Sequence, residues 1–261
     1  MSDRVERLAE TLAEAWKSGR TVPLPPLEEA PSSRAEAYAV QDRMAELIGG
    51  RVVGWKVGAT VKAVQMFEGH DGPLPGRIFA DRLFESPAEV PARLITGLKI
   101  EAEFAFRLTE DVGPGEAPFS EEGIADRLVF HPALELAGSR YAPGTGNRAA
   151  RTFDGIADNG SSGAVVIGPA VEDWRRLDFS TMAIETTIDD SPPIQVYTGA
   201  YRRDPVAIMV ETLNDLVARG VGLKAGDVIL TGSLTLPTLL RAGQTVSARF
   251  GDCGTLSLRM V

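Results

Sequence analysis

The sequence predicts an α+β fold that is rich in β-structure. Two amphipathic helical segments open the chain, a series of strand-like segments follows, and the chain ends in two runs of strict apolar alternation. Only one clear helical segment interrupts the strands. The strands are therefore neither evenly alternated with helices, as in α/β folds, nor free of helices, as in all-β folds.

The first 50 residues predict a helical region. One helix carries apolar residues at helical spacing and can end at Gly19. A proline-rich connector covers residues 21–31. A second helix starts at the capping box Ser33-Arg34-Ala35-Glu36 and stops at Gly49-Gly50. We expect residues 1–50 to form a helical N-terminal region, packed as one compact unit with a β-rich domain of residues 51–261 that carries the functional site.

The rest of the chain predicts strands around one helix. Strand-like segments occupy residues 52–58, 99–108, 128–136, 164–167 and 182–188. Asp204 and Pro205 suit a helix N-terminus, and Gly220 suits its end. Three further strands are expected at residues 227–230, 245–250 and 255–260, and residues 251–254 join the last two as a hairpin.

Composition excludes several classes of protein. The 261 residues carry a formal net charge of −9, which argues against binding to nucleic acid or to anionic membranes. Cys253 is the only cysteine, so no internal disulfide can form and a reducing compartment is expected. Because we find neither a signal-peptide core nor a long apolar segment, the cytoplasm is the expected location.

Two glutamates one residue apart are the most informative feature. Glu101 and Glu103 lie in a predicted strand, so their side chains share one face, while Ala102, Phe104 and the following alternate residues face the core. Adjacent like charges are unfavourable unless a cation neutralises them. A third acid, Glu135, interrupts an apolar run, where an unpaired carboxylate is costly to bury. Three oxygen donors suit a hard divalent cation such as Mg²⁺, although solvated glutamates on an exposed sheet face are the alternative.

Other polar residues leave alternatives open. Lys56 lies between glycines, where it is either solvated or held in an apolar site with a lowered pKa. Asp81 is either a helix cap or an acid in the site. Residues 158–163 form a polar loop that could bind an anionic group, although an ordinary turn is favoured. For His131 a structural role is favoured over a role as acid or base, and His70 is expected to lie in a loop.

Several common catalytic motifs do not occur in the sequence. We find no Gly-x-Ser-x-Gly elbow, no phosphate-binding lysine loop, no dinucleotide glycine motif and no Cys/His zinc spacing. Hydrolysis through a covalent intermediate, ATP-dependent chemistry and NAD-dependent chemistry are therefore disfavoured.

The ordered set of motifs from Tyr38 to the end resembles a known family. The chain is similar to 2-keto-4-pentenoate hydratases and 4-oxalocrotonate decarboxylases, within the fumarylacetoacetate hydrolase superfamily. The segments that carry the resemblance are Gly54-Trp55-Lys56-Val57-Gly58, Ile100-Glu101-Ala102-Glu103, Pro132-Ala133-Leu134-Glu135, Asp158-Asn159 and residues 226–233. Gly97-Leu98-Lys99 departs from the Pro-Arg that the family often has before the paired glutamates.

The resemblance implies a mixed β roll or barrel with flanking helices, and a Mg²⁺ or Mn²⁺ ion held by Glu101, Glu103 and Glu135. It also implies proton transfer by Lys56 and Asp81, with Glu135 assisting, and assembly into homo-oligomers. We expect substrate contacts from Asp158, Asn159, Ser161, Ser162 and Arg151 in the same site.

The activity implied first is metal-dependent addition of water to a short 2-hydroxy-2,4-dienoate from aromatic-compound degradation. The alternative is decarboxylation of a 2-oxo-3-enedioate, which needs a cation for the second carboxylate, from among Arg77, Arg140, Arg148 and Arg151. An acylpyruvate-type C–C hydrolase would need His70 or His131 to activate water. A non-catalytic subunit of a complex with a pathway enzyme should have lost these acids or the lysine, and this chain keeps all four.

Overall fold

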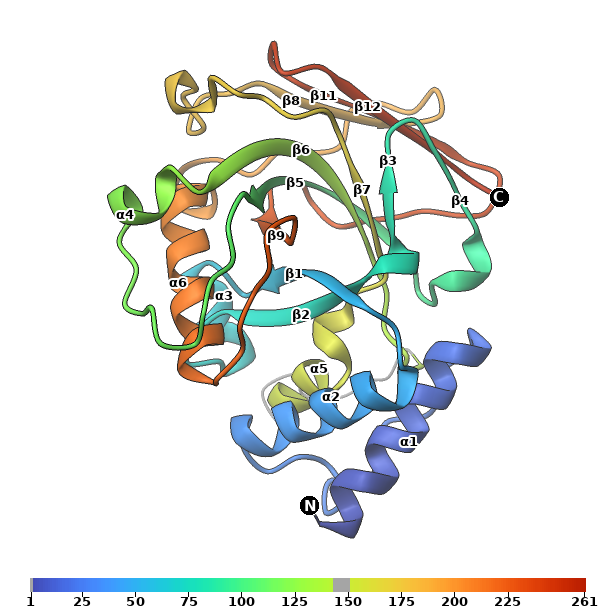
Figure 1. Cartoon of the computed structure of the whole chain (residues 1–261). Coiled ribbons are helices and arrows are strands. Elements are labelled where there is room, and N and C mark those ends of the chain that lie inside the picture. The colour runs from blue at the N-terminus through green and yellow to red at the C-terminus, as the bar shows by residue number, and fades with distance from the viewer. Residues whose placement is uncertain (1, 143–150) are drawn as a thin grey trace.

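A strongly curled eight-stranded sheet lies at the centre of the structure, and a four-stranded sheet packs against its outer face (Figure 1). This computed structural model describes residues 2–142 and 151–261. The strand order is β2-β1-β9-β5-β6-β7-β3, and β10 also pairs with β5. The strands of this sheet are β1 (Val52–Gly58), β2 (Leu74–Phe79), β3 (Leu83–Glu85), β5 (Lys99–Leu108), β6 (Leu128–Ala137), β7 (Ala164–Ile167), β9 (Val228–Ser233) and β10 (Thr238–Leu239).

The main core lies between the two sheets. The smaller sheet has the order β4-β12-β11-β8, formed by β4 (Ala88–Val90), β8 (Ile184–Ile188), β11 (Thr245–Phe250) and β12 (Thr255–Met260). Phe104 and Phe106 of β5 project into this core, where both rings contact Phe130 and Phe179. The predicted core face of the glutamate strand and the predicted C-terminal hairpin are therefore confirmed.

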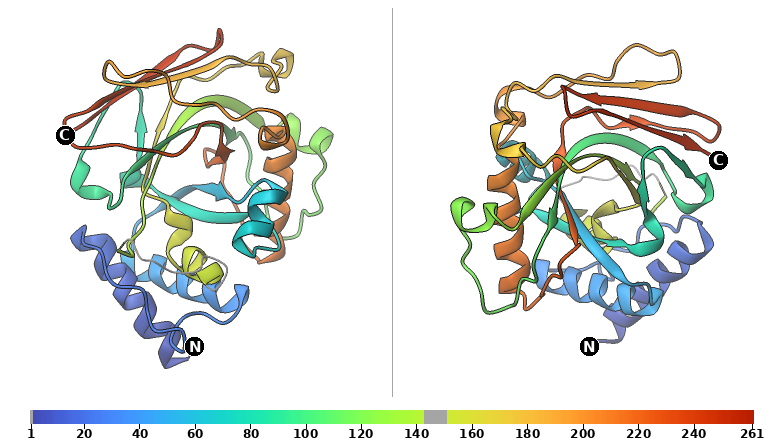
Figure 2. Two further views of the ribbon diagram at one scale, coloured as in Figure 1. Left: turned by 180° about the vertical axis from the view of Figure 1, so that it is seen from behind. Right: turned by 45° about the horizontal axis from the view of Figure 1, so that its top comes forward.

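Helices close the other sides of the roll (Figure 2). They are α1 (Asp3–Ser18), α2 (Arg34–Ile48), α3 (Lys62–Glu68), α4 (Glu121–Ala125), α5 (Thr152–Ala157) and α6 (Pro205–Ala218). As predicted, Gly19 ends α1 in a left-handed conformation, and the Asp204 carboxylate caps α6 by accepting from two backbone N–H groups. The apolar faces of α1 and α2 pack against Phe79 and Ile156 of the remaining chain. No helix among residues 2–142 and 151–261 is long and apolar enough to cross a membrane.

The inner face of the curled sheet positions the polar residues. Side chains alternate along a strand, so the face opposite to Phe104 and Phe106 points into the curl. Small residues such as Ala105 and Ala133 line the inside together with buried aliphatic side chains. Glu101, Glu103 and Glu135 belong to the same inner face, because β5 and β6 pair in antiparallel register with Glu101 opposite Glu135.

The predicted fold class is confirmed as a β-rich α+β roll with flanking helices. The sequence interpretation did not include β2, because Pro75 and Gly76 interrupt its pattern. The structure explains why they are tolerated: β2 lies at the edge of the sheet, where a missing N–H group and a flexible residue disturb few ladder bonds. The boundary proposed between residues 50 and 51 stays a prediction.

Candidate metal centre

Three carboxylates from two neighbouring strands converge inside the roll. Glu101 and Glu135 are direct cross-strand partners, and Glu103 lies two residues further along the same face of β5. One carboxylate oxygen of each residue lies within 4.8 Å of the corresponding oxygens of the other two. The structure therefore brings together the three acids that the sequence predicts as metal ligands.

Burial makes this arrangement electrostatically unfavourable without a cation. Glu103 and Glu135 are each 1% exposed. Burial, with the neighbouring charge of Glu135, raises the pKa of Glu101 to about 7, and burial with the charges of Glu135 and Glu101 raises the pKa of Glu103 well above its usual range. Neither oxygen of Glu135 accepts a hydrogen bond from a described residue. Only charged neighbours can therefore compensate for the burial of this carboxylate.

Lys56 of β1 supplies one positive charge at this site. Its Nζ atom lies 3.2 Å from Glu135 Oε1, and the side chain is buried. Burial lowers the pKa of Lys56, but the combined charges of the three glutamates exceed that effect, so the net direction is upward. Of the alternatives for Lys56, a lowered pKa is therefore not favoured in this environment, because the neighbours are acidic rather than apolar.

A bulge in β9 completes the surroundings of Glu103. Between Ser233 and Leu230 the pairing with β5 shifts register, and Gly232 adopts a left-handed φ of 94°. This conformation lets the Gly232 N–H donate to Glu103 Oε2 at 2.9 Å. A Cβ atom at residue 232 would lie only 2.6 Å from Thr60 Oγ1, so the close approach also requires glycine.

Glu101 and Glu103 open onto a cavity of about 180 Å³. Lys56, Glu101 and Glu103 form its polar side, and Val61 and Val64 contribute to an apolar wall.

Two tyrosines that the sequence interpretation did not single out also line this cavity. The rings of Tyr197 and Tyr201 are stacked, with centroids 5.9 Å apart. Burial raises the pKa of Tyr197, and the charge of Glu101 adds to this effect. No motif in the sequence marks either tyrosine, because the segment that carries them is irregular and only the fold brings it beside β5.

The donor set fits a hard divalent cation. When ionised, three carboxylates and one ammonium sum to −3 + 1 = −2, which a divalent cation neutralises. Mg²⁺ and Mn²⁺ prefer oxygen ligands, and the open cavity leaves room for water or a chelating acid at the remaining positions. Within the described chain, these three acids form the one cluster with metal-binding geometry.

We predict that stabilisation by Mg²⁺ increases with pH. The folded-state pKa of Glu101, about 7, lies above its ordinary value of 4.5, so its protonated form stabilises the metal-free fold below pH 4.5 and this contribution is lost as the pH rises through 7. Mg²⁺ binds the ionised form and offsets the loss. At about 100-fold excess over Kd, the gain should approach 2.7 kcal/mol at about pH 8 and be much smaller at about pH 5. Thermal unfolding with Mg²⁺ or chelator at both pH values measures this; equal gains would contradict it.

Asp81 does not join this centre. Gly76 of β2 pairs with Lys56, whereas Asp81 follows the far end of that strand, beyond Phe79. The strand carries the chain roughly 10 Å between Gly76 and Phe79. The Asp81 side chain is 68% exposed and lies 3.4 Å from Arg82. In this chain the edge strand β2 leads Asp81 away from Lys56, and the role of Asp81 in proton transfer stays a prediction.

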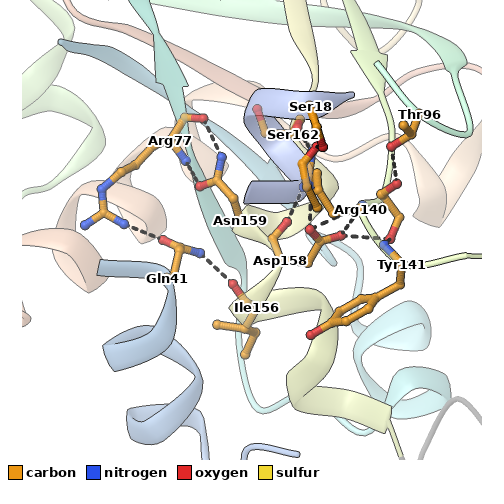
Figure 3. A network of polar contacts seen from close by, with 12 residues as sticks. Ser18, Gln41, Arg77, Thr96, Arg140, Tyr141, Ile156, Asp158, Asn159 and Ser162 are labelled. Atoms are coloured by element: carbon orange, nitrogen blue, oxygen red, sulfur yellow. Dashed lines mark hydrogen bonds and ion pairs between the residues drawn. The ribbon is translucent and has the colours of Figure 1, made fainter. Parts of the chain in front are cut away.

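Three of the residues predicted to contact a substrate belong to a network of polar contacts within the fold (Figure 3). Asp158 is fully buried and pairs with Arg140, with a 2.5 Å contact between its Oδ1 and Arg140 Nε. The Asn159 side chain accepts from the Arg77 N–H and donates to its carbonyl, which fixes the loop to β2. Ser162 is buried, and its carbonyl accepts from Arg140. The side chains of Asp158 and Asn159 thus have partners within the fold, whereas Ser162 contributes its backbone carbonyl; contact of these residues with a substrate stays a prediction.

The guanidinium of Arg140 also lies over the ring of Trp16 in α1, 5.1 Å from its centroid. Arg82 contacts the same ring at 4.4 Å. The N-terminal helix is thereby coupled to the buried loop around Asp158.

Ser161 and Arg151 line a second cavity of about 280 Å³, whose wall shares Gly58 and Ala59 with the metal cavity. Arg151 also contacts Asp154 at 3.2 Å. Of the other arginines considered for a second carboxylate, Arg77 pairs with Asp42 and Arg140 with Asp158, whereas Arg148 lies outside the described residues.

The fold and the centre define a class: enzymes with a mixed β roll and a buried cluster of acids suited to a divalent cation. Residues 142–261 match the family model described as fumarylacetoacetate (FAA) hydrolase C-terminal. The chain is 31% identical to a 2-keto-4-pentenoate hydratase from Paraburkholderia phymatum over 98% of each chain, and 30% identical to one from Paraburkholderia xenovorans over 96% of this chain and 93% of that one.

A solved 4-oxalocrotonate decarboxylase from Pseudomonas putida, complexed with magnesium and adipate, superimposes with a TM-score of 0.86 at 22% identity, covering 99% of this chain and 98% of that one. The chain belongs to the fumarylacetoacetate hydrolase superfamily and, within it, to the family of 2-keto-4-pentenoate hydratases and 4-oxalocrotonate decarboxylases.

Proposed function

We propose that this protein is a divalent-metal-dependent hydratase that adds water to a short 2-hydroxy-2,4-dienoate of aromatic-compound degradation. The observation that carries the proposal is the buried trio of Glu101, Glu103 and Glu135 with Lys56 on the inner face of the roll. Relatives at 30–31% identity over nearly the whole chain are 2-keto-4-pentenoate hydratases, which supports the substrate class.

The residues present suggest distinct tasks. A divalent cation held by the three glutamates would supply Lewis-acid polarisation of a 2-oxo acid. Lys56 holds a proton at Nζ beside the place where the acid end of the substrate would lie, and its contact with Glu135 fixes its position. The flat rings of Tyr197 and Tyr201 and the apolar Val61 suit a planar conjugated chain and exclude bulk water.

Decarboxylation is the second candidate, since a relative 28% identical over 97% of each chain is a 4-oxalocrotonate decarboxylase. A second carboxylate would require a cation beyond the metal centre. Among the described arginines considered for this role, Arg151 lines the adjoining cavity, and its charge is shared with Asp154. This favours a substrate with one carboxylate. Retention of the acids and Lys56 argues against a non-catalytic subunit.

The test separates these activities. Metal-stripped protein is reconstituted with Mg²⁺ and given 2-hydroxypenta-2,4-dienoate or 2-oxohex-3-enedioate, while ultraviolet absorbance, CO₂ release and the NMR spectrum of the product are followed. We expect 4-hydroxy-2-oxopentanoate from the dienoate only when metal is present. Release of CO₂ from the dioate without hydration of the dienoate would identify a decarboxylase, and cleavage of acylpyruvates alone a hydrolase.

We also propose that the protein is a cytoplasmic homo-oligomer and that it associates with a pathway enzyme. Exposed apolar side chains such as Leu27, Phe67 and Leu239 support burial of part of this surface between subunits. Light scattering of the purified protein tests the oligomeric state.

A further inference from the structure

The metal cavity has a second cavity as its neighbour, and a tyrosine lies between the two. The metal cavity, which Glu101 and Glu103 line, has a volume of about 180 Å³. The second cavity, of about 390 Å³, shares Val61 and Tyr201 with it, so these two side chains form the wall between the cavities. In so small a metal cavity, a substrate whose acid end lies at the glutamates has its distal carbons against the remaining walls, which include this shared wall.

Hydrogen bonds between backbone groups fix Tyr197 next to the metal centre. The Tyr197 N–H donates to the Leu234 carbonyl, and the Leu234 N–H donates to the Ala102 carbonyl, each at 2.8 Å. Ala102 lies between the two glutamates of β5. Burial raises the pKa of Tyr197, and the charge of Glu101 adds to this effect, which agrees with a phenol close to that carboxylate. Tyr197 therefore belongs to the same cavity as the metal ligands.

Tyr201 is held in the shared wall from several sides. Its ring stacks on the ring of Tyr197, with centroids 5.9 Å apart. The next two residues are anchored, because the Arg202 guanidinium donates to two backbone carbonyls and Arg203 donates to the Thr60 carbonyl at 2.6 Å. Tyr201 is thus fixed in place although it is 48% exposed.

The two cavities differ in their positive charges. Among the described residues that line the metal cavity, Lys56 is the one cation, and it already contacts Glu135. The second cavity is lined by Lys62 and Arg203. Arg203 pairs there with Glu211, whereas Lys62 forms no ion pair with a described residue. A carboxylate at the distal end of a substrate would therefore find a cation beyond the shared wall and not within the metal cavity.

We propose that Tyr201 is a specificity-determining residue, which restricts the protein to dienoates whose distal end is small and uncharged, and that Tyr197 positions its ring. This inference rests on the proposed hydratase function and narrows its substrate class. The ring occupies the space that a longer substrate needs. Its face also carries partial negative charge, and a carboxylate without a partner is costly to desolvate, so a second carboxylate is rejected more strongly than an apolar group of the same size.

The experiment compares kcat/KM for three dienoates with the Mg²⁺-reconstituted protein. The shortest is 2-hydroxypenta-2,4-dienoate. The second, 2-hydroxyhepta-2,4-dienedioate, adds a carboxymethyl group on C5, and the third, 2-hydroxy-7-methylocta-2,4-dienoate, adds an uncharged isobutyl group of similar size. We expect the wild type to prefer the shortest substrate by about tenfold or more over the isobutyl compound and by a larger factor over the dioate.

Tyr201→Ala should join the two cavities. We expect its kcat/KM for both larger substrates to rise by about 10–100-fold, mainly through KM, while its Mn²⁺ affinity stays that of the wild type. Tyr201→Phe keeps the ring and should behave as the wild type. Leu239→Ala is the control, because Leu239 is 63% exposed and lines neither cavity.

A second substitution tests the charge beyond the shared wall. Lys62→Gln, added to Tyr201→Ala, should lower kcat/KM for the dioate by about fivefold and leave the isobutyl compound unchanged. Because Lys62 is exposed, this difference should shrink as the salt concentration rises. An equal effect on both larger substrates would show that Lys62 does not meet the distal carboxylate and would overturn the part of the inference that concerns charge.

Failure of this inference is distinguishable from failure of the proposed function. Wild-type protein whose kcat/KM values for the shortest substrate and the dioate agree within about threefold overturns the inference alone. Folded Tyr201→Ala with wild-type preferences does so too, and if circular dichroism shows this variant to be unfolded, Tyr201→Val decides by the same criterion. Wild-type protein that hydrates none of the three dienoates overturns the proposed function and this inference together.

Discussion

Glu103→Gln should abolish metal-dependent turnover. The substitution keeps the shape of the side chain, and its amide oxygen can still accept from the Gly232 N–H, but it removes one of three anionic ligands. Loss of about 4 kcal/mol of stabilisation at the transition state corresponds to roughly a 10³-fold fall in kcat/KM. Titration calorimetry with Mn²⁺ should show an affinity weakened by about 100-fold or more.

The same variant should unfold at a higher temperature than the wild type when both are metal-free at about pH 8, because it relieves repulsion among buried carboxylates. Glu89→Gln is the matched control, since Glu89 is an exposed strand glutamate in β4. The control should bind Mn²⁺ and turn over substrate as the wild type does. Wild-type Mn²⁺ affinity in Glu103→Gln would remove Glu103 from the ligand set.

Lys56→Met should be inactive and markedly destabilised. The substitution leaves Glu135, which is 1% exposed, without the ammonium 3.2 Å away. Breaking a buried pair by removing one partner typically costs about 3–5 kcal/mol. Urea unfolding of the metal-free protein measures this loss, and the same preparation, reconstituted with Mg²⁺, is assayed for hydration.

A double variant separates stability from chemistry. Lys56→Met combined with Glu135→Leu removes both buried charges, so most of the lost stability should return while activity stays absent. An additive loss in the double variant would show that Lys56 and Glu135 do not interact in the folded protein. Full activity in Lys56→Met would exclude the lysine from proton transfer and from binding the acid end of the substrate.

The sequence predicts the metal centre better than it predicts its surroundings, for a physical reason. The period of two along a strand places Glu101 and Glu103 on one face, and the cost of burying Glu135 in an apolar run implies a partner. Both inferences are local, and the structure brings the three acids together. The same local reasoning gives the strand boundaries of β1, β5, β11 and β12.

Residues that reach the site through irregular backbone could not be placed in this way. The position of Asp81 could not be predicted, because the path of the chain after an edge strand follows no regular period. Asp158 and Asn159 carry suitable groups for a ligand, but only tertiary contacts with Arg140 and Arg77 show that these groups are already satisfied. Tyr197 lies in a loop whose position depends on long-range packing, so no spacing rule indicates it.

The indole of Trp16 has a practical consequence for truncation. Two guanidinium groups and the ring of Phe79 contact it, so α1 supplies a wall for the Arg140 side chain. A shortened version of the chain that starts at β1 would expose this arginine and its paired aspartate to water. Any truncated form of the protein should therefore keep α1. Without α1, Arg140 would lose its contact with Trp16, and the segment around Asp158 and Ser161 would be held less firmly.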